Sequence, residues 1–119
     1  METVADRMTS PVLTIDRDEN VKTAAKKIYA NEIGSLLVTH NQSFIGIITK
    51  TDLMIKVLAE NLDAKSTLVA EVMSQPLISI AADESLDSAI EILREKSIRH
   101  LAVNQNNQIV GIISIKDLR

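Results

Sequence analysis

The feature that most constrains this sequence is an internal repeat. Shifting the chain by 65 positions aligns residues 4–53 with residues 69–118 without a gap, and 17 of the 50 aligned pairs are identical. Average composition would give about 3 or 4 identities by chance. The identities include whole segments, such as Gly-Ile-Ile at 46–48 and again at 111–113. The chain is therefore a tandem duplication of one structural unit.

Each repeat is predicted to form a β-α-β-β-α unit. A proline opens a short β-prone run in each copy. Because proline has no N–H to donate to the ladder, it is confined to positions such as the first residue of a strand. Asn20 and Ser85 are suitable N-caps for the amphipathic helical patterns that follow them. The predicted strands are residues 11–15, 35–39 and 44–48, and residues 76–80, 100–104 and 109–113. We therefore predict an α+β fold of two tandem β-α-β-β-α repeats packed as a pseudo-two-fold pair.

The joint between the repeats is polar. Residues 60–68 are suited to a connection, so we place the first repeat at 1–62 and the second at 63–119. A closing helix is predicted over residues 51–62 in the first copy, with an apolar face formed by Leu53, Met54, Val57 and Leu58. The second copy reaches Arg119 where its own closing helix is expected, so that helix is predicted to be truncated. Because about 55 residues bury little surface, we expect each half to need the other for its core.

Composition excludes several classes of site. The chain has no Cys, which removes disulfides, thiolate nucleophiles and Cys-based zinc sites, and its 2 His are too few for a multi-His metal centre. A net charge of −3 and 2% aromatic residues provide neither a basic footprint nor stacking platforms for nucleic acid. No apolar run approaches the roughly 20 residues of a membrane span. We predict a cytoplasmic protein without membrane insertion, nucleic-acid binding or enzyme activity.

The repeated motifs resemble those of a known family. Each copy carries Val-x-x-x-Met-[Thr/Ser]-x-Pro, an amphipathic helix, Ile-x-x-Leu-x-Val, and Gly-Ile-Ile-[Thr/Ser]-x-x-Asp-Leu. This pattern is similar to that of a CBS-domain pair, also called a Bateman module, over residues 4–118. The resemblance implies a regulatory module that binds AMP, ADP, ATP or, in some members, S-adenosylmethionine in clefts between the repeats. It also implies a homodimer, because such modules usually associate as disc-like dimers.

Two turns in the same phase of the repeats provide candidate ligand-binding residues. Thr49 with Asp52, and Ser114 with Asp117, each fit a helix capping box, in which the hydroxyl and the acid satisfy backbone N–H groups. The same geometry suits a nucleotide, because a helix start attracts phosphate and a carboxylate offers acceptors to a ribose diol. The resemblance assigns the Asp to the ribose and the hydroxyl to ligand contact. Capping and binding are compatible, and we expect ligand contact in at least one copy.

A basic segment distinguishes the second repeat. Arg99 and His100 stand where the first copy has Gly34 and Ser35. Arg99 is suited either to a solvated position at a helix end or to a phosphate, which its planar fork binds in a bidentate way. His100 is interpreted either as a half-buried strand residue or as a second basic contact. Because the resemblance places basic residues of this segment at the phosphates, we expect one site to bind phosphate better than the other.

The remaining candidates are small, apolar or flexible. The resemblance brings the backbone and small side chains near Thr14 and Ser79 to the nucleobase. Ile33 and Ile98 belong to the predicted apolar slot for adenine, although a place in the core is the simpler interpretation of each. Lys116 either assists phosphate binding or is solvated.

Two glycines lie inside predicted strands, where glycine usually lowers stability. We predict that Gly46 and Gly111 mark a bulge or close strand packing. A P-loop at Gly46 is rejected, because the second glycine and the four-residue gap are missing.

Two functions follow from these observations. The first is a non-catalytic module that binds an adenosyl ligand between its repeats and responds by a shift between conformations. The alternative is a dimerisation or docking scaffold with vestigial clefts that regulates a partner enzyme or transporter. Thermal-shift screening with adenosyl ligands separates the two functions, because only the first requires a ligand that stabilises the folded chain.

Overall fold

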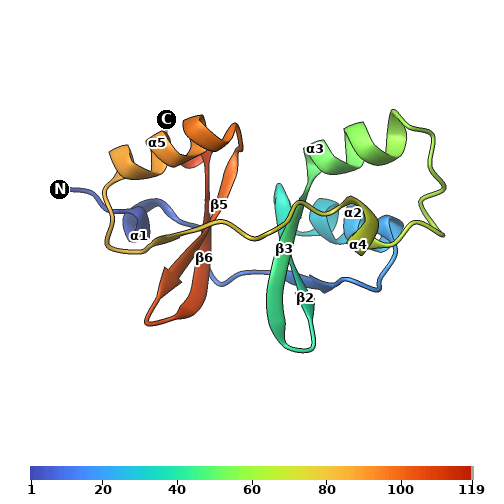
Figure 1. Cartoon of the computed structure of the whole chain (residues 1–119), viewed down its shortest axis with the longest axis horizontal. Helices are drawn as coiled ribbons and strands as arrows, with labels where there is room; N and C mark the ends of the chain where they lie inside the picture. Colours follow the sequence, from blue (N-terminus) through green and yellow to red (C-terminus); the bar gives the residue numbers. More distant parts are fainter. Residues whose placement is uncertain (119) are drawn as a thin grey trace. The chain divides into compact units, whose positions relative to one another are not determined.

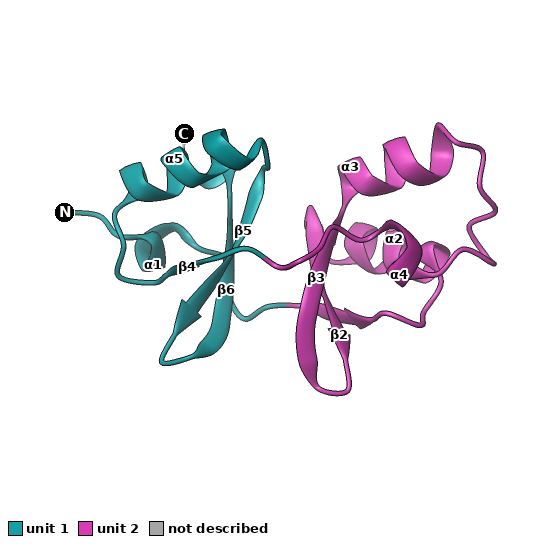
Figure 2. Ribbon diagram, viewed as in Figure 1, with its two compact units in different colours: residues 1–12, 78–119 teal, residues 13–77 magenta. Residues whose placement is uncertain are grey.

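The computed structural model describes residues 1–118 and divides the chain into two compact units (Figure 2). The first-repeat unit comprises residues 13–77, and the second-repeat unit combines residues 1–12 with the chain from Ile78 onward. Each repeat therefore contributes its leading segment to the unit that is built on the other repeat. The leading segment is residues 1–12 in the first repeat and residues 69–77 in the second. The boundaries of the sequence repeats therefore differ from those of the compact units, which lie after residue 12 and after residue 77. Arg119, the last residue of the predicted second repeat, lies outside the described residues.

The first-repeat unit is a mixed sheet with helices (Figure 1). Strand β1 is parallel to β2, and β3 is antiparallel to β2, which gives the order β1-β2-β3. The strands are β1 (Thr14–Asp16), β2 (Ser35–His40) and β3 (Ser43–Thr49). The helices are α2 (Val21–Ala30), α3 (Lys50–Asp52), the π-helix η1 (Leu53–Leu58) and α4 (Val69–Val72).

The second-repeat unit repeats this topology, with the order β4-β5-β6. Its strands are β4 (Ser79–Ala81), β5 (His100–Gln105) and β6 (Gln108–Ser114). Its helices are α1 (Val4–Arg7), α5 (Leu86–Lys96) and the 3₁₀-helix η2 (Ile115–Leu118). The predicted α+β class is confirmed, as is the order strand, helix, strand, strand in both repeats.

The local sequence starts the two long helices as predicted. The Asn20 side chain accepts a hydrogen bond from the Thr23 N–H at 2.8 Å, and the Ser85 hydroxyl accepts one from the Ser88 N–H at 3.1 Å. Each bond satisfies one of the N–H groups that have no partner inside the helix. Within residues 1–118 no helix has the length and the apolar character that crossing a membrane requires.

Close approach at the two strand glycines joins each leading segment to its sheet. A Cβ atom added to Gly46 would lie 2.7 Å from the Ser74 carbonyl oxygen, and Ile47 exchanges backbone hydrogen bonds with Ser74. In the other unit, a Cβ atom on Gly111 would lie 3.0 Å from the Thr9 carbonyl oxygen.

The predicted bulge is confirmed, because the register of each antiparallel pair shifts beside the glycine, between Val38 and Thr39 and between Val103 and Asn104. The close approach of the leading segment at the same positions was not predicted.

Each unit has an apolar core that its leading segment completes. Val69, from α4, is fully buried in the cluster of the first-repeat unit, and Val4, from α1, is fully buried in that of the second-repeat unit. The other fully buried large side chains are Val21, Leu36, Leu37, Val38 and Ile48 in the first-repeat unit, and Leu101, Val103 and Ile113 in the second. The expected dependence of each half on the other therefore takes the form of these exchanged segments.

The closing helix differs from the prediction. It changes to a π-helix after Asp52, with the Ala59 N–H donating to the Met54 carbonyl oxygen at 2.9 Å, and it ends at Leu58 rather than near residue 62. The side chain of Val57 is buried, but Met54 and Leu58 are 57% and 77% exposed. The wider π turn breaks the 3.6-residue spacing on which the predicted apolar face depends.

Candidate functional site

The turn after β3 forms a complete capping box. The Thr49 N–H and hydroxyl donate to Oδ2 of Asp52 at 2.9 and 3.1 Å, and the Asp52 N–H donates to the Thr49 hydroxyl at 3.0 Å. Asp52 is only 7% exposed. The reciprocal bonds satisfy backbone groups at the start of α3, so the structural role predicted for this motif is confirmed.

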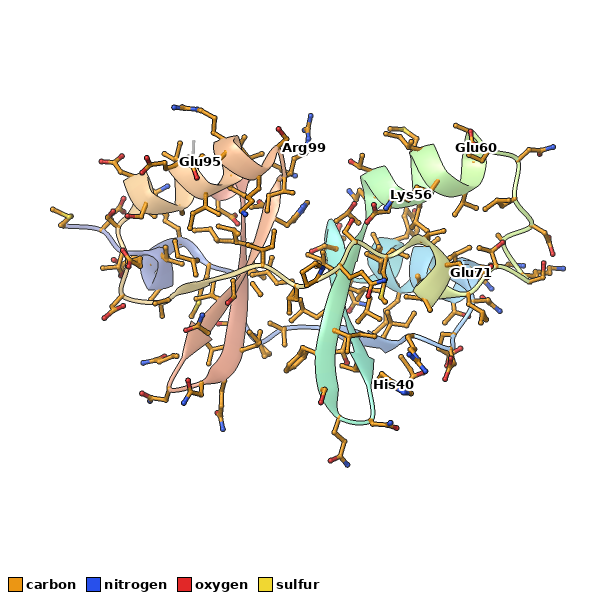
Figure 3. All side chains as sticks on the ribbon, in the orientation of Figure 1. His40, Lys56, Glu60, Glu71, Glu95 and Arg99 are labelled. Carbon is orange, nitrogen blue, oxygen red and sulfur yellow. The ribbon has the colours of Figure 1, made fainter. Side chains whose placement is uncertain are left out.

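A lysine and a serine contact the other oxygen of Asp52. The Lys56 ammonium lies 3.0 Å from Oδ1, and the Ser74 hydroxyl donates to the same oxygen at 3.3 Å. Lys56 also donates to the Val72 carbonyl oxygen at 2.9 Å. Figure 3 shows Lys56 on the helical segment that follows β3. The buried carboxylate is thus paired by groups from two other parts of its unit.

The turn after β6 repeats one half of this capping geometry, the bonds from Ser114 to the Asp117 carboxylate. The Ser114 N–H and hydroxyl donate to Oδ2 of Asp117 at 2.8 and 3.1 Å. Asp117 is half-buried. Among residues 1–118, both hydrogen bonds to the Asp117 carboxylate are accepted by Oδ2. Oδ1 therefore keeps its acceptor capacity towards the described part of the chain.

An arginine of the leading segment borders this turn. Arg7 donates to the Asp117 backbone carbonyl oxygen at 2.9 Å and pairs with Glu2 through two bonds of 2.8 and 3.1 Å. The hydrogen bond with Glu2, and then its charge, raise the pKa of Arg7. In the same helix, hydrogen bonds from the Thr3 backbone and hydroxyl lower the pKa of Asp6. Both pairs join α1 to the residues just before it. Arg7 donates to the backbone of Asp117 rather than to its carboxylate.

The basic segment of the second repeat lies beside the Ser114 turn. Arg99 is exposed between α5 and β5 (Figure 3), and its carbonyl oxygen accepts a hydrogen bond from the Ile115 N–H at 2.9 Å. His100 is half-buried and pairs with Ser114 in the antiparallel register of β5 and β6. The fold therefore brings Arg99, His100, Ser114 and Asp117 together, although the first two are far from the others in sequence.

The candidate strand residues have polar neighbours of their own. The Thr14 carbonyl oxygen accepts a hydrogen bond from the Lys27 ammonium, and the Ser79 hydroxyl accepts one from the Asn104 amide at 3.0 Å. Thr14 is half-buried and lies in the first-repeat unit, whereas Ser79 is exposed in the second-repeat unit. Each group is therefore partly engaged by its own unit.

The three remaining candidates divide between the units in the same way. Ile33 and Ile98 are half-buried and pack against the cores of the first- and second-repeat units, respectively. Lys116 is exposed in η2, between Ser114 and Asp117. The second-repeat unit thus holds most of the predicted polar and charged candidates.

The family follows from a comparison with known proteins. The chain matches the model of the CBS domain twice, at residues 4–59 and 69–119. The chain belongs to the CBS-domain family. It is a CBS pair, and the predicted resemblance is confirmed over nearly the whole sequence.

Similar proteins include members of known structure. The CBS domain-containing protein YhcV of Bacillus subtilis (strain 168) is 30% identical over 118 residues, which cover 99% of this chain and 84% of YhcV. The hexameric CBS-CP12 protein from bloom-forming cyanobacteria has a TM-score of 0.92 at 29% identity, with 99% of this chain and 69% of that chain covered. The CBS pair of protein MJ0100, in complex with 5′-methylthioadenosine and S-adenosyl-L-methionine, has a TM-score of 0.86 at 25% identity, with coverages of 98% and 92%. Other curated relatives are longer, and the chain spans 56% of one and 21% of another.

The groups that pair with Asp52 in this CBS pair were not predicted from the sequence. The position of Lys56, four residues after Asp52 on a predicted helix, is a recognised spacing for an ion pair and was a usable signal. Ser74 gave no such signal, because its contact depends on the leading segment of the second repeat packing against β3.

An apolar groove was also missed. It has a volume of ≈ 700 Å³ and lies between α2 and η1 of the first-repeat unit. Tyr29, Met54 and Leu58 line it, and Tyr29 and Leu58 are 86% and 77% exposed. Exposed apolar side chains gathered along one groove are typical of an interaction surface.

Proposed function

We propose that this CBS pair is a regulatory, non-catalytic module that binds an adenosyl ligand at the Ser114–Asp117 turn. The observation that carries the proposal is the state of the Asp117 carboxylate. Ser114 holds its Oδ2, and Oδ1 accepts no hydrogen bond from residues 1–118. A ribose diol presents two hydroxyl donors, which a carboxylate with a spare oxygen can accept.

The neighbours of the turn favour a ligand that carries phosphate. Arg99 is exposed beside η2, and His100 faces Ser114 across the strand pair. A guanidinium binds phosphate oxygens in a bidentate geometry, which suits Arg99 to a phosphate contact. We therefore place AMP, ADP and ATP ahead of S-adenosylmethionine, with Lys116 as a further cation near the phosphates.

The relative MJ0100 supports the choice of ligand class. The two ligands of that protein, 5′-methylthioadenosine and S-adenosyl-L-methionine, share the adenosyl group. AMP and ATP contain the same adenine and ribose diol, so the part of the ligand that Asp117 would recognise is common to all four. The interaction with the ribose then selects adenosyl ligands as a class, and the basic segment of Arg99 and His100 selects the members that carry phosphate.

Binding would act by shifting a conformational equilibrium. A ligand that binds one conformation better than another stabilises it by the difference in binding free energy. We assign no reaction to the module. Its output is the altered conformation that a partner enzyme or transporter would sense.

Calorimetric titration with AMP tests the assignment of Asp117. We expect Asp117→Asn to weaken AMP binding by about tenfold or more, because a hydrogen bond to a charged group contributes about 1.5–3 kcal/mol. Asp52→Asn is the matched variant and should change the dissociation constant by less than about twofold.

The ligand itself provides the control for this titration. 2′-Deoxyadenosine 5′-monophosphate lacks one hydroxyl of the diol and should bind more weakly than AMP to the unmodified protein. The dissociation constants of Asp117→Asn and Asp52→Asn for this ligand should also differ less than those for AMP. Equal weakening of AMP binding by Asp52→Asn and Asp117→Asn would contradict the assignment.

A second candidate function is self-association, as a homodimer. The supporting observation is the groove between α2 and η1, where Tyr29 and Leu58 are largely exposed. Burying such side chains between two copies is favourable at about 25 cal/mol per Å² of apolar surface. The relative CBS-CP12 is described as hexameric, which supports association of CBS pairs as a class of behaviour.

A further inference from the structure

The acceptor sites of Asp52 are filled by its own unit. An ionised carboxylate offers about four lone-pair sites for hydrogen bonds. Oδ2 accepts from the Thr49 N–H and hydroxyl, and Oδ1 contacts the Lys56 ammonium at 3.0 Å and the Ser74 hydroxyl at 3.3 Å. With four donors in place and 7% exposure, the carboxylate has little capacity for a ribose diol.

Lys56 is held in position by a hydrogen bond to the backbone as well as by its ion pair with Asp52. Its ammonium also donates to the Val72 carbonyl oxygen at 2.9 Å, so it bridges the start of the closing helix and the end of α4. It lies within η1, and short π-helical segments are rare and are often associated with functional sites. Its side chain is nevertheless 43% exposed, which leaves room to replace it without disturbing the core.

Ser74 adds a second donor through the leading segment. The Ile47 N–H donates to the Ser74 carbonyl oxygen at 3.0 Å, and the Ser74 N–H donates back to Ile47 at 2.8 Å. This pair of backbone bonds fixes the serine beside Asp52. Displacing either donor would leave a polar group without its partner next to a buried carboxylate, which is costly.

The second-repeat unit lacks this arrangement among its described residues. Thr9 occupies the repeat position of Ser74 and is exposed, and Arg7 occupies that of Val72. Arg7 donates to the backbone carbonyl oxygen of Asp117 and not to its carboxylate. Among residues 1–118, the Asp52 carboxylate therefore receives four donors and the Asp117 carboxylate two.

We propose that Lys56 is a specificity-determining residue, which closes the Asp52 turn to adenosyl ligands and confines binding to the Ser114–Asp117 turn. The inference rests on the proposed function and adds a stoichiometry to it. One chain binds one AMP, and removal of the ammonium from Asp52 creates a second site.

The test is a count of AMP sites per chain by calorimetry and equilibrium dialysis. The variant is Lys56→Met, which keeps the apolar stem and removes the ammonium. We expect one site in the unmodified chain and two in Lys56→Met, with the new site at least about tenfold tighter than any residual binding at Asp52 in the unmodified chain. Lys65→Met is the matched control, because Lys65 is an exposed lysine outside the cluster, and should bind one AMP.

A rescue variant locates the new site. Asp117→Asn should weaken the single site by about tenfold or more, and Lys56→Met with Asp117→Asn should again have one tight site. Adding Asp52→Asn to Lys56→Met should return the count to one. Lys56→Ala provides a second way to remove the ammonium, and melting curves without AMP verify that each variant is folded.

The outcomes separate this inference from the proposed function. Two sites in the unmodified chain, or one site in both Lys56→Met and Lys56→Ala, would overturn the inference and leave AMP binding established. Loss of the single site in Lys56→Met would make Lys56 a ligand contact and would also overturn it. No AMP binding in any folded variant would overturn the proposed function together with the inference.

Discussion

At the scale of single residues, the glycine of β3 sets how closely the leading segment approaches the sheet. A Cβ atom on Gly46 would lie 2.7 Å from a backbone oxygen of Ser74, which cannot move without breaking its bonds to Ile47. At Gly111 the nearest atom to the added carbon is the Met8 sulfur, at 2.6 Å, and that side chain is flexible. The nearest backbone atom there, the Thr9 carbonyl oxygen, lies 3.0 Å away. The two repeat-related glycines are therefore not equally replaceable.

We expect Gly46→Ala to lower the free energy of unfolding by about 1–3 kcal/mol, because the backbone of two segments must move apart. Gly111→Ala should cost less, since the Met8 side chain can adopt another rotamer and alanine reduces the entropy of the unfolded chain. Urea unfolding of both variants measures the difference. An equal or larger loss for Gly111→Ala would contradict this account of the approach.

The two aspartates show how much of the candidate site was predictable. The complete capping box of Thr49 and Asp52 and the partial one of Ser114 and Asp117 were predicted, because a hydroxyl and an acid three residues apart act on the backbone of their own turn. The difference between Asp52 and Asp117 was not, because it depends on Ser74, which is distant in sequence. The expected inequality of the two turns was inferred from Arg99 and His100 alone, and the filled acceptors of Asp52 give it a second physical basis.

At the scale of elements, the helical segment after β3 has two roles: it holds the lysine that pairs with Asp52, and it forms part of an exposed apolar groove. One side of η1 places Lys56 against Asp52, and another leaves Met54 and Leu58 exposed along the groove with α2. Helical spacing predicted the apolar residues of this segment but not their exposure. A hydrophobic pattern identifies a face that avoids water, whereas the partner that covers it is not encoded in the pattern.

We expect Leu58→Ser to weaken self-association while leaving the stability of the single chain nearly unchanged, because a side chain that is 77% exposed contributes little to the core. Sedimentation velocity over a range of concentrations measures the association. Phe44→Ser is the control, since Phe44 is a partly exposed aromatic outside the groove. Unchanged association in Leu58→Ser, or equal weakening in the control, would contradict an interface at the groove.

Elements differ in how well the sequence predicts them. The strands and long helices were predicted because two copies of each pattern agree and because Asn20 and Ser85 act locally as caps. The four-residue helices α1 and α4 were missed. The third residue of each is an acid that accepts a hydrogen bond from the backbone N–H three residues earlier, Asp6 from Thr3 and Glu71 from Leu68. So short a helix nevertheless has almost no periodicity to detect.

At the scale of the whole molecule, the exchange of leading segments makes the two repeats interdependent. Val4 is fully buried in the core formed by the second repeat, and Val69 is fully buried in the core formed by the first. The two copies were evident in the sequence but this exchange was not, because a sequence repeat does not record which copy a segment packs against. Neither repeat contains its complete core.

We expect Val4→Ala to loosen the sheet of residues 79–114 and Val69→Ala to loosen the sheet of residues 14–49, each at a cost of about 2 kcal/mol. Hydrogen exchange of backbone amides, measured strand by strand, distinguishes the two variants. Because the two substitutions are chemically identical, each serves as the control for the other. Loss of protection in the sheet of the same sequence repeat would contradict the exchange.

The measurement that tests the central claim most directly is the melting temperature of the unmodified protein in the presence of AMP. A ligand that binds only the folded chain stabilises it by RT ln(1 + [L]/Kd), so the melting temperature should keep rising with AMP concentration above Kd. ADP, ATP and S-adenosylmethionine complete the series, and 2′-deoxyadenosine 5′-monophosphate should give a smaller shift than AMP. If none of these compounds shifts the melting temperature, the module is not an adenosyl sensor, and the scaffold function replaces it.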